Sequence, residues 1–155
     1  MQNTVIVAPH PDDEIIGCYK YLKGTDPIII YDGDTPKERR EEALKLKDQL
    51  KVKAQLFQNT IPTTFMESGT RIFVPDPIYE THPLHRKWGA LGEEISRRGY
   101  PVIFYSTNMN APYIYEVSNS SGKESLLNTV YPSQSDLWKY EKKYVLFEGY
   151  CQWNP

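Results

Sequence analysis

Residues 4–14, TVIVAPHPDDE, join a short apolar run to a cluster of polar and charged side chains. The run from Thr4 to Ala8 is rich in β-branched residues and does not alternate with polar ones, a pattern typical of a strand buried on both faces. The run stops at Pro9, and three acids follow. Acidic side chains are favourable in the first turn of a helix, so we expect a helix over residues 13–22.

The same order of strand and helix recurs along the chain. Thr35 is expected to cap the second helix, with Glu38 completing a capping box. Further strands are predicted at 27–31, 52–57, 71–74 and 102–105, with an extended edge piece at 113–117. Helices are predicted from Thr35 onward and over 84–98 and 134–144, and a polar loop is predicted at 118–122. This alternation predicts an α/β fold with an open, mostly parallel sheet of five or six strands. With helices on both faces, it would be a Rossmann-like three-layer sandwich.

Length and composition narrow the class of protein. A chain of 155 residues with 39% hydrophobic and 25% charged residues fits a single globular domain over residues 1–155. No apolar run is long enough to span a membrane, and the N-terminus lacks a basic signal region. A net charge of −2 gives no reason to expect nucleic-acid binding. Two cysteines, Cys18 and Cys151, far apart in the chain, favour a reducing, cytoplasmic location.

Two clusters of candidate functional residues follow predicted strands. His10, Asp12, Asp13 and Glu14 stand at the carboxyl end of the first strand, where open α/β sheets bind ligands. Adjacent carboxylates favour a cation, although acids at a helix N-terminus also serve as caps and complement the dipole. The segment 81–85, THPLH, supplies the other two of the three histidines at a second loop–helix junction. Together the clusters offer imidazoles and carboxylates suited to zinc with an open coordination position.

Five short motifs occur in a fixed order along most of the chain. They are APHPDDE at 8–14, RREEA at 39–43 followed by Leu50, HPLH at 82–85, YPSQ at 131–134 and FEGY at 147–150. In this order they resemble the motifs of the GlcNAc-PI de-N-acetylase family, the PIG-L/LmbE-like zinc-dependent deacetylases. The first motif is highly specific, whereas the last two would be weak alone. The resemblance implies removal of an N-acetyl group from an amino sugar or related N-acyl amine.

The resemblance also implies roles for individual residues. His10, Asp13 and His85 match the zinc ligands, although another divalent metal is compatible with the same set. Asp12 matches the general base, and His82 matches a residue that stabilises the oxyanion. Glu14 is expected to orient a neighbouring side chain or to serve the helix dipole. Arg39 either reaches the pocket and binds substrate or lies on a solvated helix face, and Tyr113 either packs or forms an aromatic wall for a ligand.

The motifs also depart from the family pattern. Leu84 stands where many members have aspartate, so the usual carboxylate partner of His82 is missing. The chain is short, which predicts an open pocket. The short chain and the departure at Leu84 each leave another function in view. One is a deacylase of a larger molecule, such as a modified nucleotide or a glycan end. The other is a metal-binding interaction protein without catalysis.

Overall fold

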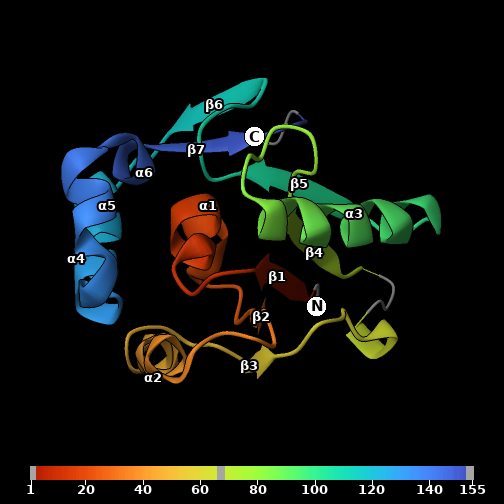
Figure 1. The fold of residues 1–155 in the computed structure, drawn as a ribbon, viewed down its shortest axis with the longest axis horizontal. Helices are drawn as coiled ribbons and strands as arrows, with labels where there is room; N and C mark the ends of the chain where they lie inside the picture. Colours follow the sequence, from red (N-terminus) through yellow and green to blue (C-terminus); the bar gives the residue numbers. More distant parts are fainter. Residues whose placement is uncertain (1–2, 66–68, 153–155) are drawn as a thin grey trace.

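A computed structural model describes residues 3–65 and 69–152. The described residues form one seven-stranded sheet in the order β3-β2-β1-β4-β5-β7-β6 (Figure 1). Its strands are β1 (Thr4–Ala8), β2 (Ile28–Tyr31), β3 (Ala54–Phe57), β4 (Arg71–Pro75), β5 (Val102–Ser106), β6 (Tyr113–Glu116) and β7 (Phe147–Tyr150). The first five are parallel to one another, and β7 is antiparallel to both of its neighbours. The open, mostly parallel sheet predicted from the sequence is confirmed.

Helices cover both faces of the sheet, which makes a three-layer sandwich (Figure 1). The longer helices are α1 (Asp13–Leu22), α2 (Lys37–Leu44), α3 (Pro83–Arg97) and α4 (Ser120–Val130), and two short ones, α5 (Ser135–Tyr140) and α6 (Lys143–Leu146), precede β7. Alternate residues of β1 serve the two faces: Ile6 joins the core under α1, α2 and α4–α6, whereas Val5 joins the core under α3. This explains why the run 4–8 is apolar without alternation.

The strand order changes direction at β1, whose two neighbours, β2 and β4, lie on opposite sides of it. The chain leaves β1 through α1 to β2 on one side, and β4 returns to pair with β1 on the other. In open α/β sheets a ligand crevice lies at such a switch point, beyond the carboxyl ends of the strands. The loop after β1, which carries His10, and the end of the loop after β4, which carries His82 and leads to His85 in the first turn of α3, therefore meet at one rim.

The start of α2 differs from the sequence prediction. Thr35 does not cap the helix: its hydroxyl donates to the carbonyl of Asp32 over 2.7 Å, and Pro36 occupies the cap position without a side-chain hydrogen bond. The α-helix ends at Leu44 and continues as a 3-10 turn over Lys45–Asp48. The predicted capping box is wrong because the preceding turn uses the Thr35 hydroxyl.

The C-terminal third differs more. The predicted polar loop at 118–122 contains the start of α4, capped by the Asn119 side chain, which accepts the Gly122 N–H over 3.0 Å. The helix predicted over 134–144 is two short helices. Strand β7 was not predicted at all, because FEGY is short and contains a glycine, so its strand character comes from pairing with β5 and β6.

Candidate metal centre

Three residues from two distant parts of the chain converge at the switch point. His10 follows β1, Asp13 is the first residue of α1, and His85 lies in the first turn of α3. His10 and His85 are 75 positions apart in sequence, yet His10 Nδ1 lies 3.1 Å from His85 Nε2. Asp13 Oδ2 lies 2.9 Å from His85 Nε2 and 3.5 Å from His10 Nδ1. The ligand atoms thus form a compact triangle.

The size of this triangle suits a divalent metal ion. A tetrahedral ion with ligands at ~2.0–2.1 Å holds its ligand atoms about 3.3 Å apart, close to the separations observed here. Two imidazole nitrogens and one carboxylate oxygen form a donor set that zinc and similar ions accept. Among the described residues, His10, Asp13 and His85 form a group able to hold a metal ion, as the sequence predicted.

The electrostatics of the triangle favour a positive charge. Burial alone would raise the pKa of Asp13, but His85 and His10 beside it hold that pKa well below its usual range. Burial alone would lower the pKa of His85, yet Asp13 and Glu80 raise it to about 10. The field that retains a proton on His85 also attracts a metal cation, which would displace that proton on binding.

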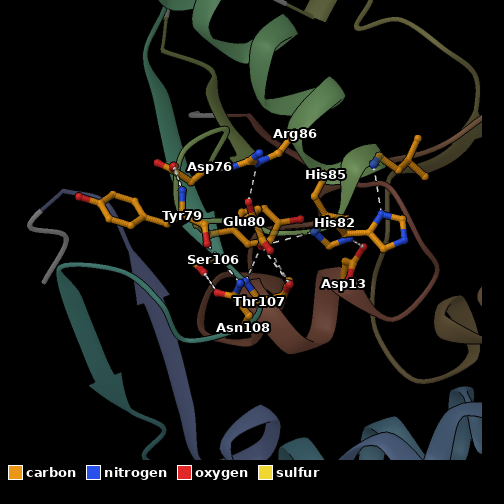
Figure 2. Close-up of polar contacts among 12 residues, drawn as sticks. Asp13, Asp76, Tyr79, Glu80, His82, His85, Arg86, Ser106, Thr107 and Asn108 are labelled. Atoms are coloured by element: carbon orange, nitrogen blue, oxygen red, sulfur yellow. Dashed lines mark hydrogen bonds and ion pairs between the residues drawn. The ribbon is translucent and has the colours of Figure 1, made fainter.

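Glu80 lies behind His85 (Figure 2) and is a residue that the sequence analysis missed. Its Oε1 is 3.4 Å from His85 Nδ1, on the ring edge opposite the triangle. Thr107, just after β5, holds the same carboxylate with its backbone N–H at 2.6 Å and its hydroxyl at 2.9 Å. A carboxylate beside the second nitrogen of a ligand histidine orients the ring and raises its basicity. The signal was available, since Glu80 follows β4 at the same rim as the histidines.

Asp12 is buried next to the triangle and does not serve as a helix cap. Its position precedes α1, but its side chain makes no capping hydrogen bond. Burial raises the pKa of Asp12 well above the usual range, and the neighbouring Asp13 carboxylate adds to the shift. Its backbone has φ of 122°, a left-handed conformation that a residue with a side chain adopts only under strain. Capping therefore does not explain this acid.

Glu14 is buried among hydrogen-bond donors, as expected of a residue that orients a neighbour. Its Oε2 accepts the backbone N–H of Asp12 over 3.1 Å, and its Oε1 accepts the hydroxyls of Tyr31 and Tyr131. Burial raises the pKa of Glu14 to about 7. The contact with the Asp12 backbone helps to hold the strained residue in place.

Arg39 turns toward the site rather than lying on a solvated helix face. Its guanidinium donates to the carbonyl of Pro11 and lies 3.7 Å from Asp12 Oδ2. On the other side, its Nε is 3.6 Å from Glu42 Oε1. Glu42 in turn accepts the backbone N–H and the hydroxyl of Ser133. Two of the motifs quoted from the sequence, RREEA and YPSQ, are therefore in contact beside Asp12.

His82 lies at the mouth of the site, at the N-cap of α3. Its ring packs edge-on against His10, with 4.6 Å between ring centroids, and its Nδ1 accepts the N–H of Leu84 over 3.1 Å. Burial, followed by the nearby His10 and His85, lowers the pKa of His82. The ring is thus neutral near pH 7, with its proton on Nε2.

Tyr113 lies on the outer strand β6, in register with Tyr150 of β7. Three strands, β4, β5 and β7, lie between β1 and β6 in the sheet. Tyr113 is therefore not among the residues that lie around the histidines. Its proposed role as an aromatic wall for a ligand stays a prediction.

Comparisons with protein-family models, with curated proteins and with solved structures found no significant match. Within residues 3–65 and 69–152, no helix combines the length and apolar character needed to cross a membrane.

Proposed function

We propose that this protein is a zinc-dependent hydrolase that removes an N-acyl group from an amino sugar or related amine. The observation that carries the proposal is the triangle of His10, Asp13 and His85 with the buried carboxyl of Asp12 beside it. The ordered motifs that resemble the GlcNAc-PI de-N-acetylase family support it independently. We extend the proposal to membership of that family.

The metal would be held by His10 Nδ1, His85 Nε2 and Asp13 Oδ2. When bound there, a divalent ion would supply Lewis-acid chemistry, lowering the pKa of water to ~7 and polarising an amide carbonyl. Asp12, buried beside the triangle, would act as general base. Its raised pKa suits a carboxylate that accepts a proton from water and later donates it to nitrogen.

The protein's own side chains would transfer the proton and stabilise the charges that develop during the reaction. The water oxygen bonds to the carbonyl carbon as Asp12 takes one water proton, and the C–N bond breaks as Asp12 gives that proton to the amine. The second water proton remains on the carboxylic acid product, which ionises to solvent, so the products are a carboxylate, a free amine and a proton. His82, with Nδ1 accepting from Leu84, presents its Nε2–H as a donor to the developing oxyanion. Arg39 offsets the charge of Asp12 in its ionised form.

Replacement of Asp12 tests the mechanism. We expect Asp12→Asn to lower the rate of amine release from N-acetylglucosamine derivatives and other N-acyl amines by about 10²–10⁴-fold, because the base is lost. Zinc affinity should stay within a few-fold. Asp48→Asn is the matched control, because Asp48 is an exposed carboxylate in the 3-10 turn after α2 and is not part of the triangle.

Full activity in Asp12→Asn would rule out this mechanism. Tight zinc binding with no turnover on a broad amide panel would instead favour a metal-binding protein without catalysis. Activity confined to acylated nucleotides or glycans would favour a large substrate.

A further inference from the structure

A cavity of about 410 Å³ adjoins the candidate metal centre. His10 lines it, so the cavity and the triangle of ligand atoms share a wall. The volume falls within the ~300–1,000 Å³ of small-molecule sites. A group bound in the cavity would therefore extend directly from an atom held at the metal centre.

Most of the surface of the wall is apolar, and four of its nine residues have apolar side chains. Three are prolines, from the loop after β1 and from the start of α2, and the fourth is Leu84 at the start of α3. They are Pro9, Pro11, Pro36 and Leu84. Rigid rings and a leucine present carbon surface, from which water is displaced favourably by an apolar ligand.

Two polar side chains of the wall, those of Asp32 and Thr35, are already hydrogen-bonded within the protein. Asp32 is buried; its Oδ1 accepts the Trp88 indole N–H and its Oδ2 accepts the Asp34 backbone N–H, each over 3.0 Å. The Thr35 hydroxyl donates to the carbonyl of Asp32. These bonds use the Thr35 hydroxyl proton and one acceptor site on each oxygen of Asp32, which a sugar hydroxyl would otherwise contact.

The backbone carbonyls of the three prolines are also engaged. Those of Pro9 and Pro36 accept backbone N–H groups at 3.3 and 3.0 Å, and that of Pro11 accepts the Arg39 guanidinium. Arg39 pairs with Asp12 and Glu42, and Asp34 stands at the exposed rim. A hydrocarbon chain would contact the apolar surface of the wall without breaking any of these hydrogen bonds.

We propose that this cavity binds an apolar acyl chain longer than acetyl, and that Leu84 is its specificity-determining residue. The inference rests on the proposed deacylase function for the identity of the ligand. The acyl carbonyl would lie at the metal centre and the chain would run between Leu84 and the prolines. The amine carrier would then remain outside, toward solvent.

The first test does not depend on metal or on catalysis. Metal-free protein with labelled leucine methyl groups is titrated with hexanamide and, in parallel, with acetamide, and the Leu84 signals are assigned from the Leu84→Asp spectrum. We expect saturable shifts of the Leu84 methyl signals with hexanamide and none with acetamide at equal concentration. Absence of any Leu84 shift with hexanamide would overturn the proposal.

The second test measures chain-length dependence on zinc-loaded protein. Straight-chain hydroxamic acids from acetyl to hexanoyl are compared by calorimetry. We expect affinity to rise about fourfold per methylene. Leu84→Asp should abolish this rise. Leu91→Asp is the matched control, because Leu91 packs half-buried on the same helix and core cluster but does not line the cavity, so the rise should persist.

The outcomes separate this proposal from the function on which it rests. Equal affinity of acetyl and hexanoyl hydroxamates in wild type would overturn the acyl-chain site, as would a rise that survives in Leu84→Asp. Hexanamide shifts at Leu84 without release of amine from any N-acetyl or N-hexanoyl substrate would leave the chain-binding site standing and count against deacylation alone.

Discussion

Glu80 acts on the candidate metal centre without being one of its ligands. Its carboxylate is buried, fixed by Thr107, and 3.4 Å from the nitrogen of His85 that faces away from the triangle. We expect Glu80→Gln to weaken zinc affinity by about 10–100-fold, because an amide neither orients nor polarises the imidazole as a carboxylate does. Competition with a fluorescent chelator measures the affinity.

A control variant separates this effect on zinc affinity from the general effect of removing a buried carboxylate. Glu148→Gln removes a carboxylate that is equally buried but lies on β7, away from the histidines, and should leave zinc affinity unchanged. Unchanged affinity in Glu80→Gln would show that Thr107 and Glu80 only support the loop.

At the scale of an element, the fit of α3 against the sheet decides where His85 stands. Gly89 is one turn after His85, and a Cβ at Gly89 would come within 2.7 Å of the carbonyl oxygen of Pro75 and the backbone nitrogen of Pro77. Although alanine is the better helix former, we expect Gly89→Ala to lower the free energy of unfolding by about 1–3 kcal/mol, because the helix must move from β4.

The same shift should displace His85 and weaken zinc binding. Urea unfolding and chelator competition measure the two effects. Ala90→Ser, on the exposed side of the same helix, should change neither appreciably. A Gly89→Ala variant as stable as wild type would contradict the close approach of helix and strand.

The packing of α4 against α1 and β7 buries a charge. Lys123 Nζ donates to the carbonyls of Ile16 and Phe147 at 2.7 and 3.3 Å. Burial lowers its pKa to about 8, against the opposing effects of Glu148 and Cys18. The unfolded chain keeps this proton until about pH 10.5, so between pH 8 and 10.5 the unfolded state binds more protons than the folded state.

Stability should therefore rise with pH in that window through Lys123. We expect the free energy of unfolding of wild type to gain about 3 kcal/mol relative to Lys123→Met between pH 8 and 10.5. Urea unfolding at a series of pH values measures the difference. The exposed Lys139 supplies the control, since Lys139→Met should track wild type throughout. If the difference in the free energy of unfolding between wild type and Lys123→Met did not change with pH, the Lys123 amine would keep its ordinary pKa.

At the scale of the whole molecule, the candidate metal centre lies between two segments that are far apart in the sequence. His10 belongs to the first crossing and His85 to α3 on the opposite face. An ion bound to both stabilises only the folded chain. At a zinc concentration of 100 times the dissociation constant, we expect about 2.7 kcal/mol of added stability and a rise in Tm of about 5–10 °C.

Scanning calorimetry with and without zinc measures the rise. His10→Ala should lose it, whereas His82→Ala should keep it, because His82 is outside the triangle. A zinc-dependent rise that survives in His10→Ala would place the ion elsewhere on the protein.

The strands and helices of the first hundred residues were predictable from sequence because their signals are local. The apolar run 4–8 and the acids after it specify a buried strand and a helix start wherever they occur. The C-terminal elements were less predictable. Strand β7 owes its conformation to its two partners, and Asn119, the cap of α4, is preceded and followed by residues equally typical of a loop.

By itself, the sequence determined which functional groups this protein carries and after which strands they stand: two histidine motifs and a run of acids. Only the tertiary structure decided how close they lie. Pairing of β4 with β1 brings His85 within 3.1 Å of His10, and the folding back of α2 aims Arg39 at Asp12. The local pattern of a segment sets its own conformation, whereas distances across the chain depend on which buried faces pack together.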